Sequence, residues 1–370
     1  MPRLLATSAR LLLLLAGATL LQAEDPAPPA ETPRAALDRF REDLAGKLWG
    51  LQVSAFGDAL YARDADSGRM KARFGAFELD LGADLAEYLQ ASAAVVASKD
   101  GTQLTVGFLD AHFFGGRIAP RGRLWVEKGF HLQAGRFDVP FGNDWQFFAS
   151  KDSVSISRPL TTESLMEGGY NDTGVRVLGN DGTFNFNAYV LRGFSSGRLA
   201  GGRAGFTPFG NPFSLAGARE AKVLELGASY LFDRGADGRK RGSAYALDAE
   251  LRGGSWLFRG EYLERAWEGW DGAPPTTKRG WHLDTELGLG EALPWPVTLF
   301  ARYERAGGLP AEDPGAVRYD GRWAAGASLS LGGIAQVKVE GQRFSTATAE
   351  TQASPAYRGT QFLAQLVLVF

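Results

Sequence analysis

From residue 50 to its end, the chain alternates apolar and polar residues in segments roughly ten residues long. The last segment is the clearest, because its apolar residues share one parity: Phe362, Ala364, Leu366, Leu368 and Phe370. Gln361 and Gln365 lie on the other parity. Successive side chains of a strand point to opposite faces, so a period of two predicts strands with one apolar and one polar face.

The composition limits what such strands can build. The chain has 370 residues, 48 Gly and 12% aromatic residues, and no apolar run beyond the N-terminus approaches the ~18 residues of a membrane helix. Aromatic residues recur where the apolar parity of a segment ends: Tyr61, Phe113, Tyr230, Trp256, Tyr262, Trp281, Tyr303, Trp323 and Phe370. An apolar band between aromatic girdles is typical of a transmembrane β-barrel. We therefore predict an all-β fold, a closed antiparallel barrel, since unpaired backbone groups in lipid cost several kcal/mol each.

Sixteen strands are predicted, with starts near residues 50, 72, 87, 104, 130, 173, 183, 200, 222, 243, 255, 280, 297, 321, 334 and 360. The strand near 200 is weak as a pattern and is kept because an even count returns both termini to one side. Short turns at 180–182, 253–254 and 332–333 alternate with long links at 266–279, 306–320 and 345–359, as expected for periplasmic turns and extracellular loops. Roughly sixteen strands predict a water-filled interior.

The N-terminus predicts export. Residues 1–23 combine Arg3 and Arg10 with the apolar run 11–21 and end on Ala23, which is the pattern of a cleaved signal peptide. Residues 24–49 follow as a periplasmic part, with a Pro-rich acidic linker and a short helix over 35–48. The barrel is predicted over 50–370.

Several classes of function are excluded by residue counts. The chain has no Cys, so it has no disulfide, Cys-ligated zinc, iron–sulfur cluster or attached haem of its own. The formal charge of -2 does not suit a nucleic-acid partner. The three histidines, His112, His131 and His282, show no ligand spacing and no nearby nucleophile, so no enzyme, metal or cofactor is predicted. Asp64–Gly68 resembles part of a calcium loop without its bidentate Glu and predicts a turn.

Two stretches carry a family resemblance. Residues 109–114 (LDAHFF) and 132–142 (LQAGRFDVPFG) resemble the strand and the "Gly-x-Phe-x-x-Pro-Phe-Gly" segment of the phosphate-selective porins, with Leu109 in place of an aromatic. The terminal Phe370, with Phe362, Leu366 and Leu368, resembles the assembly signal of outer-membrane barrels. The resemblance implies a sixteen-stranded barrel, commonly a trimer, with the loop after Pro140-Phe141-Gly142 folded into the pore.

The segment Asn143–Asn171 agrees with an inward loop, because it is too long and too apolar for a freely solvated one. It contains Trp145, Phe147, Phe148, Leu160, Leu165 and Met166. Its charged residues are then candidates for a constriction: Asp144, Lys151, Asp152, Arg158, Glu163 and Glu167. The alternative is that the aromatics pack on a neighbouring subunit or on the rim. Deleting Gln146–Thr161 is expected to raise conductance.

The polar parity predicts which charges face inward. The acids are Glu78, Asp80, Asp84, Asp110, Glu225, Asp248, Glu250, Glu261, Asp284, Glu286, Glu304 and Glu340. The bases are Arg176, Arg203, Arg252, Arg259, Arg265, Arg302 and Lys338. Rings of acids favour cations and rings of bases favour anions, so the excess of acids predicts mild or no cation preference and argues against phosphate specificity. Adjacent opposite charges either create a transverse field or pair with one another: Glu250 and Arg252, Arg259 and Glu261, Arg302 and Glu304. Arg136 falls on the lipid parity.

Together these patterns predict a general diffusion porin for small hydrophilic solutes in the outer membrane of a Gram-negative bacterium. The expected partners are lipid, lipopolysaccharide, the barrel assembly machinery and two further copies in a homotrimer. The alternatives are an anion- or phosphate-selective porin, and a barrel that sheathes a partner such as a multihaem cytochrome.

Overall fold

The computed structural model describes residues 35, 38, 39, 42, 51–116, 118, 121, 127–144, 149–193, 197–210, 222–268, 276–290, 295–310, 317–348 and 357–370. The predicted signal peptide lies outside these residues. So does the predicted periplasmic part, except Ala35, Asp38, Arg39 and Glu42, which are helical. No helix among the described residues is long and apolar enough to cross a membrane.

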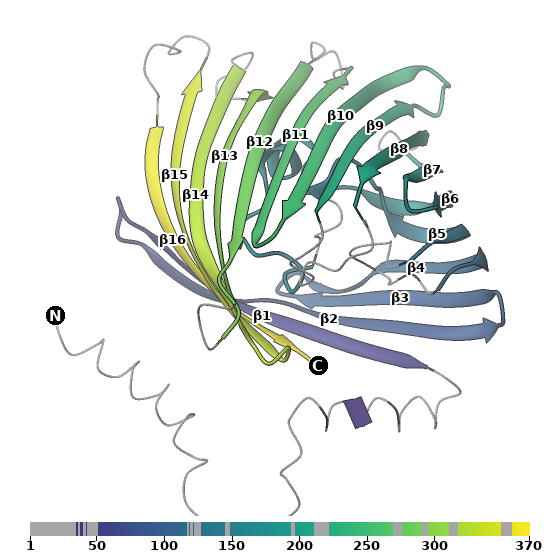
Figure 1. Cartoon of the computed structure of the whole chain (residues 1–370). Coiled ribbons are helices and arrows are strands. Elements are labelled where there is room, and N and C mark those ends of the chain that lie inside the picture. The colour runs from purple at the N-terminus through teal and green to yellow at the C-terminus, as the bar shows by residue number, and fades with distance from the viewer. Residues whose placement is uncertain are drawn as a thin grey trace, which may run out of the picture.

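Sixteen antiparallel strands form one closed barrel, in which each strand pairs with its sequence neighbours and β1 pairs with β16 (Figure 1). The strands are β1 Gln52–Asp64, β2 Met70–Ala86, β3 Leu89–Ser98, β4 Gly101–Phe114, β5 Gly129–Asp138, β6 Asn171–Asn180, β7 Phe184–Arg192, β8 Arg198–Phe209, β9 Val223–Arg234, β10 Lys240–Gly253, β11 Trp256–Trp267, β12 Thr276–Gly288, β13 Val297–Pro310, β14 Val317–Leu331, β15 Ala335–Thr348 and β16 Tyr357–Val369. The predicted fold is confirmed, including the strand near residue 200, which is β8.

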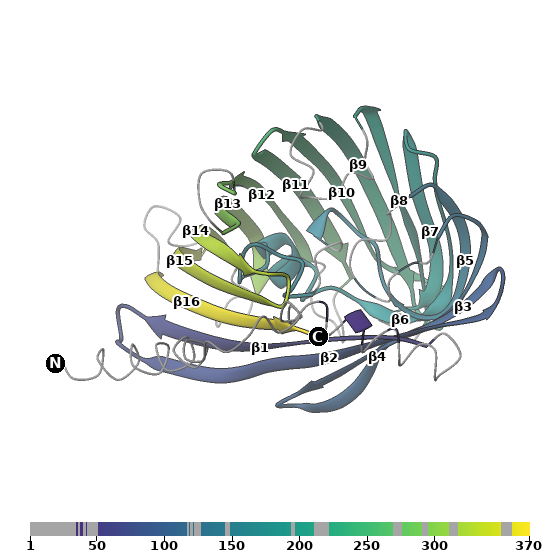
Figure 2. The ribbon, with the colours of Figure 1, turned by 60° about the horizontal axis from the view of Figure 1, so that its bottom comes forward.

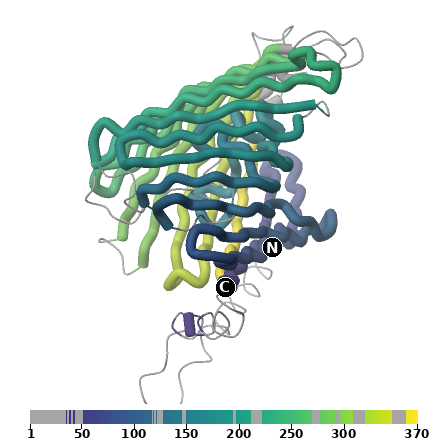
Figure 3. Tube along the Cα trace, turned by 90° about the vertical axis from the view of Figure 1, so that its right-hand side faces the viewer, coloured from purple at the N-terminus to yellow at the C-terminus, as the bar shows by residue number. Residues whose placement is uncertain are grey.

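The two parities of each strand face the two sides of the barrel wall. On β10, Leu247 is 58% exposed on the outer face, whereas Asp248 and Glu250 are buried on the inner face. Aromatic residues stand side by side on neighbouring strands of the outer face, for example Tyr303 stacked on Trp323 with ring centroids 4.1 Å apart. The alternation of the sequence therefore becomes an apolar outer surface and a polar inner wall. Figure 3 shows the strands running side by side around the barrel.

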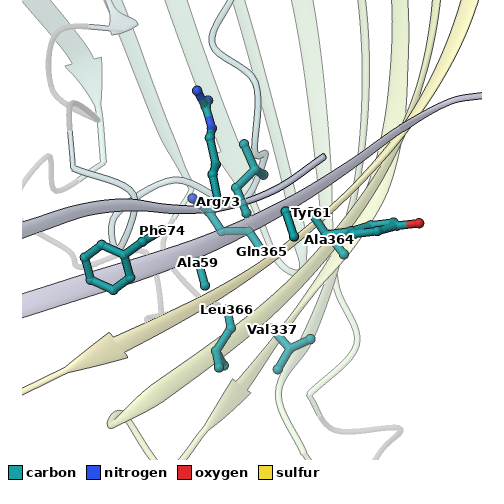
Figure 4. A pocket seen from close by; sticks show the side chains of 10 residues that line it. Ala59, Tyr61, Arg73, Phe74, Val337, Ala364, Gln365 and Leu366 are labelled. Carbon is teal, nitrogen blue, oxygen red and sulfur yellow. The ribbon is translucent and has the colours of Figure 1, made fainter. Parts of the chain in front are cut away.

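The barrel closes between its first and last strands. Phe370 N donates to the carbonyl of Ala55 at 2.7 Å, and Ala55 N donates to the carbonyl of Phe370 at 3.0 Å. Beside this seam, the outer positions Gly57 and Ala59 of β1 carry almost no side chain. At Ala59 there is a groove of about 530 Å³ that is also bordered by Tyr61, Phe74, Val337 and Leu366 (Figure 4).

The described residues between β5 and β6, 139–144 and 149–170, lie inside the wall and are called the constriction loop below (Figure 2). It contains a short π-helix, η3, at Thr161–Leu165. Apolar residues of the loop pack on apolar residues of the inner wall in one buried cluster that includes Leu160, Leu165, Met166, Leu191, Leu199, Leu231 and Leu263. The prediction that the inner parity is polar and faces water is therefore wrong for this part of the wall. The apolar loop requires an apolar surface to dock on.

Candidate constriction inside the barrel

The constriction loop begins with a turn that brings its backbone against the inner wall. Gly142 has φ +71, and a Cβ there would collide with the carboxylate of Glu261 on β11. Its amide donates to Ser229 Oγ on β9 at 3.0 Å, and the next amide, of Asn143, donates to Glu261 Oε2 at 2.7 Å. Glycine is required here because it alone combines a left-handed φ with such a close approach. The Pro-Phe-Gly segment thus directs the chain inward.

Acids of the inner wall hold the amides of the returning part of the loop. Glu340 on β15 accepts from Ile156 N at 2.7 Å and from Ser157 N at 3.1 Å. Glu304 on β13 accepts from Leu160 N at 2.5 Å. Hydrogen bonds to a charged acceptor contribute more than neutral ones, about 1.5–3 kcal/mol each. These wall carboxylates therefore fix the path of the loop.

Bases of the wall hold its carbonyl groups and acids. Arg302 donates to the carbonyl of Ser157 at 3.0 Å, and Arg265 donates to that of Leu165 at 2.7 Å. Arg322 on β14 reaches Glu163 at 3.0 Å and also bonds the carbonyl of Arg158, while Lys338 bonds that of Ser150. The loop is consequently bonded to one side of the wall, from β9 to β15.

The predicted constriction residues lie along this loop, and most are paired. Arg158 donates to Asp144 Oδ2 from Nε at 2.9 Å and from Nη2 at 2.6 Å. Burial favours a higher pKa for Asp144, but the charge of Arg158 and hydrogen bonds from Thr162 and Arg158 hold this pKa below its ordinary value. Lys151 and Asp152 form a partly exposed pair at 2.9 Å.

Glu167 stands at the end of the loop, where Arg265 and Lys278 approach its Oε1 at 2.9 and 3.3 Å. Burial favours a higher pKa for Glu167, but the two cations together lower it. Glu163 binds Arg322 and also accepts from the amide of Arg158 at 3.1 Å. The structure therefore brings Asp144, Arg158 and Glu163 together. Lys151 pairs separately with Asp152, and Glu167 pairs with the wall cations Arg265 and Lys278.

The charges predicted to line the pore are found on the inner face, and many are paired there. The ion pairs are Arg203 with Asp248 at 2.6 Å and Glu225 at 3.2 Å, Arg252 with Glu250, Arg259 with Glu286, and Arg302 with Glu304 at 3.1 Å and Asp284 at 3.7 Å. The suggested pairing of Arg259 with Glu261 is not made, because Glu261 binds the loop amide of Asn143 instead.

The most deeply buried inner charges lie in two parts of the wall. Glu304 and Lys338 are 0% exposed and Arg302 is 2% exposed, and all three contact the constriction loop. Asp110 and Arg176 are also buried, in the part of the wall formed by β4 to β6. Glu304, Lys338 and Arg302 therefore support the constriction loop, whereas Asp110 and Arg176 contact neighbouring residues of the wall, His131 and Gln133.

The alternation in sequence could have revealed two loop-binding cations that the prediction omitted. Arg322 shares the inner parity of β14 with Ala324 and Ser328, and Lys278 shares that of β12 with His282. Both lie close to predicted loops, where the register is hardest to assign from sequence. Arg136, on the lipid parity, is held by Asn171 Oδ1 at 2.8 Å from its Nη2.

A second segment enters the barrel between β4 and β5. Arg121 donates to Glu78 on β2 at 2.7 Å and to Asp138 at the end of β5 at 3.1 Å. Ile118 is buried, and its carbonyl accepts from Gln90 on β3 at 3.1 Å. Ile118 and Arg121, from the segment between β4 and β5, thus contact the inner wall on β2, β3 and β5.

The histidines are less scattered than the sequence indicates. His112 and His131 are directly paired on β4 and β5, and Asp110 Oδ2 lies 2.9 Å from His131 Nδ1. The third histidine, His282 on β12, has its Nδ1 3.0 Å from Thr161 Oγ1 of the constriction loop. Thr161 is 0% exposed and His282 is 2% exposed, so no substrate reaches this hydroxyl, and the contact holds the loop. Within the described residues, no group of three or more His, Asp or Glu is arranged to hold a metal ion.

Solved outer-membrane proteins share this architecture at low sequence identity. An anion-selective porin from Comamonas acidovorans has 12% identity and a TM-score of 0.59 over 86% of this chain and 99% of its own. OprB from Pseudomonas putida has 11% identity and a TM-score of 0.59 over 94% and 100%. OmpT from Vibrio cholerae, in its trimer form, has 12% identity and a TM-score of 0.58 over 86% and 99%.

The fold is that of the outer-membrane porins. No protein-family model matches the sequence, and no curated protein matches it. The four residues of the predicted assembly signal, Phe362, Leu366, Leu368 and Phe370, all lie exposed on the outer face of this porin fold.

Proposed function

We propose that the protein is a general diffusion porin that passes small hydrophilic solutes and ions across the outer membrane, with mild or no cation preference. The observation that carries the proposal is the constriction loop, bonded to the inner wall on one side by Glu304, Glu340 and Arg302. A loop held in this way narrows a wide barrel to the size of small solutes, and charged residues remain on the inner wall beside the apolar docking surface.

Weak selectivity follows from the pairing of charges. The cations Arg203 and Arg259 on the wall are each bonded to carboxylates, which cancels much of their field. The partly exposed groups, such as Lys151, Asp152 and Asp284, also include both signs. A pore lined by paired charges discriminates less between ions than one lined by a ring of one sign.

Purified protein in planar lipid bilayers tests the proposal. We expect stepwise conductance, and in a KCl gradient a reversal potential near zero or slightly on the cation side. A strong anion preference favours the selective-porin alternative. A non-conducting barrel that co-purifies with haem favours the sheath for a multihaem cytochrome, although the loop and Arg121 occupy interior space that such a partner would need.

The remaining assignments belong to the same proposal. The chain is exported with a signal peptide cleaved near Ala23, is inserted by the barrel assembly machinery and contacts lipid and lipopolysaccharide. The small outer residues Ala55, Gly57 and Ala59 of β1 support a homotrimer, because they allow close approach of a second barrel beside the groove of Figure 4. Native mass spectrometry in detergent tests this, and a monomer only would contradict it.

A further inference from the structure

A row of four cations crosses four neighbouring strands of the outer face. Arg192 on β7 is directly opposite Arg198 on β8, which is directly opposite Arg234 on β9. Arg234 is in turn opposite Lys240 on β10, next to a register shift between Lys240 and Gly242. All four side chains are exposed, and residues paired in this way point to the same side of a sheet. These four residues are called the basic row.

The basic row lies on the outer side of the barrel. Leu191 and Leu199, next to Arg192 and Arg198 in sequence, are buried inside the barrel, so the two arginines point outward. The row is formed by the ends of β7 and β9 and the starts of β8 and β10, at the barrel end opposite the first residue of β1 and the last of β16. Figure 1 shows β7 to β10 as consecutive strands.

Like charges directly opposite one another destabilise a sheet, and neighbouring strands are only about 4.8 Å apart. The described residues form no ion pair with any member of the row. The nearby acid Asp237, in the turn between β9 and β10, instead binds Arg241 at 2.7 Å. Within the described part of the chain the four adjacent cations have no acidic partner, and an external polyanion would supply one.

The surface next to the row, toward the middle of the barrel, is apolar and aromatic. Val190 is 52% exposed and Tyr230 is 50% exposed, on the same outer face as Arg192 and Arg234. The ring of Phe232 lies below the Arg234 guanidinium, with its centroid 5.6 Å from Cζ, and 6.3 Å from the ring of Tyr230. Aromatic residues mark the headgroup level of a membrane protein, so the basic row lies at the height of lipid phosphates.

We infer that the basic row binds the phosphorylated headgroup of a lipid in the outer leaflet, with the lipid chains on the apolar surface below. Three arginines suit this role, because the planar guanidinium donates two parallel hydrogen bonds to a phosphate. The four cations sit in one line and match a headgroup that carries more than one phosphate. The inference rests on the outer-membrane placement proposed above, and it assigns a lipid site to one part of the outer surface.

The test uses purified protein in uncharged detergent and native mass spectrometry, with diphosphorylated lipid A as the probe. Each interfacial cation near an anionic lipid surface contributes an amount equivalent to about a fivefold change in binding. We expect a loss of about fivefold for Arg198→Gln and on the order of 100-fold for the triple variant R192Q/R198Q/R234Q. Dephosphorylated lipid A is expected to bind wild type and triple variant equally.

The matched control removes three exposed cations that lie apart from one another and away from β7 to β10: R63Q/K99Q/R279Q. It changes net charge equally, and it should retain wild-type lipid binding. Equal loss in the control, or unchanged binding in the triple variant, would overturn the inference. Displacement of the lipid by an equal concentration of inorganic phosphate would also overturn it, and would assign the row to free anions. If the triple variant loses its oligomer but still binds lipid, the row belongs to a protein interface instead.

Conductance separates this inference from the proposed function. The triple variant should conduct like wild type in phosphatidylcholine bilayers, because the basic row lies outside the barrel. A wild type that binds lipid A but never conducts would refute the porin proposal and leave the lipid site standing. A wild type that conducts but binds dephosphorylated lipid A as well as the diphosphorylated form would refute the lipid site and leave the porin proposal standing.

Discussion

Arg158, on the returning arm of the constriction loop, donates two hydrogen bonds to the Asp144 carboxylate on its outgoing arm, at 2.9 and 2.6 Å. The same guanidinium reaches the carbonyl of Gly168 at 3.0 Å. One side chain thus ties together three points of the loop that are far apart in sequence. The shape of the loop depends on this contact as well as on the bonds to the wall.

Replacing Arg158 with Gln should loosen the loop. The variant loses two charge-assisted hydrogen bonds, which contribute about 1.5–3 kcal/mol each, and Asp144 keeps a charge without its partner. We expect higher and noisier single-channel conductance. Lys151→Gln is the control, because its partner Asp152 is partly exposed and the pair contributes little. Equal noise in both variants would show that the contact with Asp144 does not shape the pore.

The same contact predicts a dependence on pH. The pKa of Asp144 is lower in the folded protein than its ordinary value of 3.8. Its contribution to stability is therefore fully present above about pH 4 and is lost as the pH falls through the folded pKa. Conductance should stay constant from neutral pH to about pH 4 and become noisy below it. Asp144→Asn should be noisy at every pH, and a wild type that becomes noisy near neutral pH would contradict this account.

Glu304 is the anchor whose loss should be the most damaging. It is fully buried and accepts from Leu160 N at 2.5 Å, Arg322 Nε at 2.6 Å and Arg302 Nε at 3.1 Å. Glu304→Gln leaves two buried cations without their shared carboxylate, and breaking a buried ion pair costs about 3–5 kcal/mol. We expect a lower urea midpoint and a wider pore. Glu264→Gln, on the outer side of β11, should change neither quantity.

The strands and their faces could be predicted because both follow from a local pattern. The alternation around Leu247 and Asp248 fixes which residue faces lipid, and closure follows from the cost of unpaired edges in a membrane. The docking site of the loop could not be read in this way. Glu261 contacts Asn143 across 118 positions of sequence, and no periodicity relates two residues so far apart.

The docking surface of the loop was not predicted, but it did leave a signal in the sequence. Leu231 and Leu263 interrupt the polar parity of β9 and β11, and both belong to the buried cluster under the loop. An apolar residue on the inner parity near an extracellular end therefore indicates a surface that another segment covers. The pairing of His112 with His131 needed the exact register of β4 and β5, which the long link between these strands obscures.

Glu167 is the one described residue other than glycine with a positive φ, at 54°. Its ion pairs with Arg265 and Lys278 are partly exposed, so they contribute about 0–1 kcal/mol, similar to the gain of about 1 kcal/mol when glycine adopts this φ. Glu167→Gly should therefore leave the free energy of unfolding nearly unchanged. Glu167→Val should lower it by more than about 1 kcal/mol, because a β-branched residue is strained at this φ. Urea unfolding followed by tryptophan fluorescence measures both, and equal stability of the two variants would contradict the prediction.

Removing Phe370 should impair assembly of the barrel in the membrane. Its amide and carbonyl form two hydrogen bonds with Ala55 at one end of the β1–β16 seam, which continues from Phe56–Val369 to Asp64–Gln361, and an unpaired group in lipid costs several kcal/mol. The deletion therefore weakens the seam and also removes the aromatic end of the predicted assembly signal. Phe370→Ala separates the two causes, since it keeps the backbone bonds and loses the ring. If the ring is the signal, Phe370→Ala should reduce the heat-modifiable form on gels as much as the deletion does. Normal assembly of Phe370→Ala would leave only the seam as the cause, and normal assembly of the deletion would contradict both.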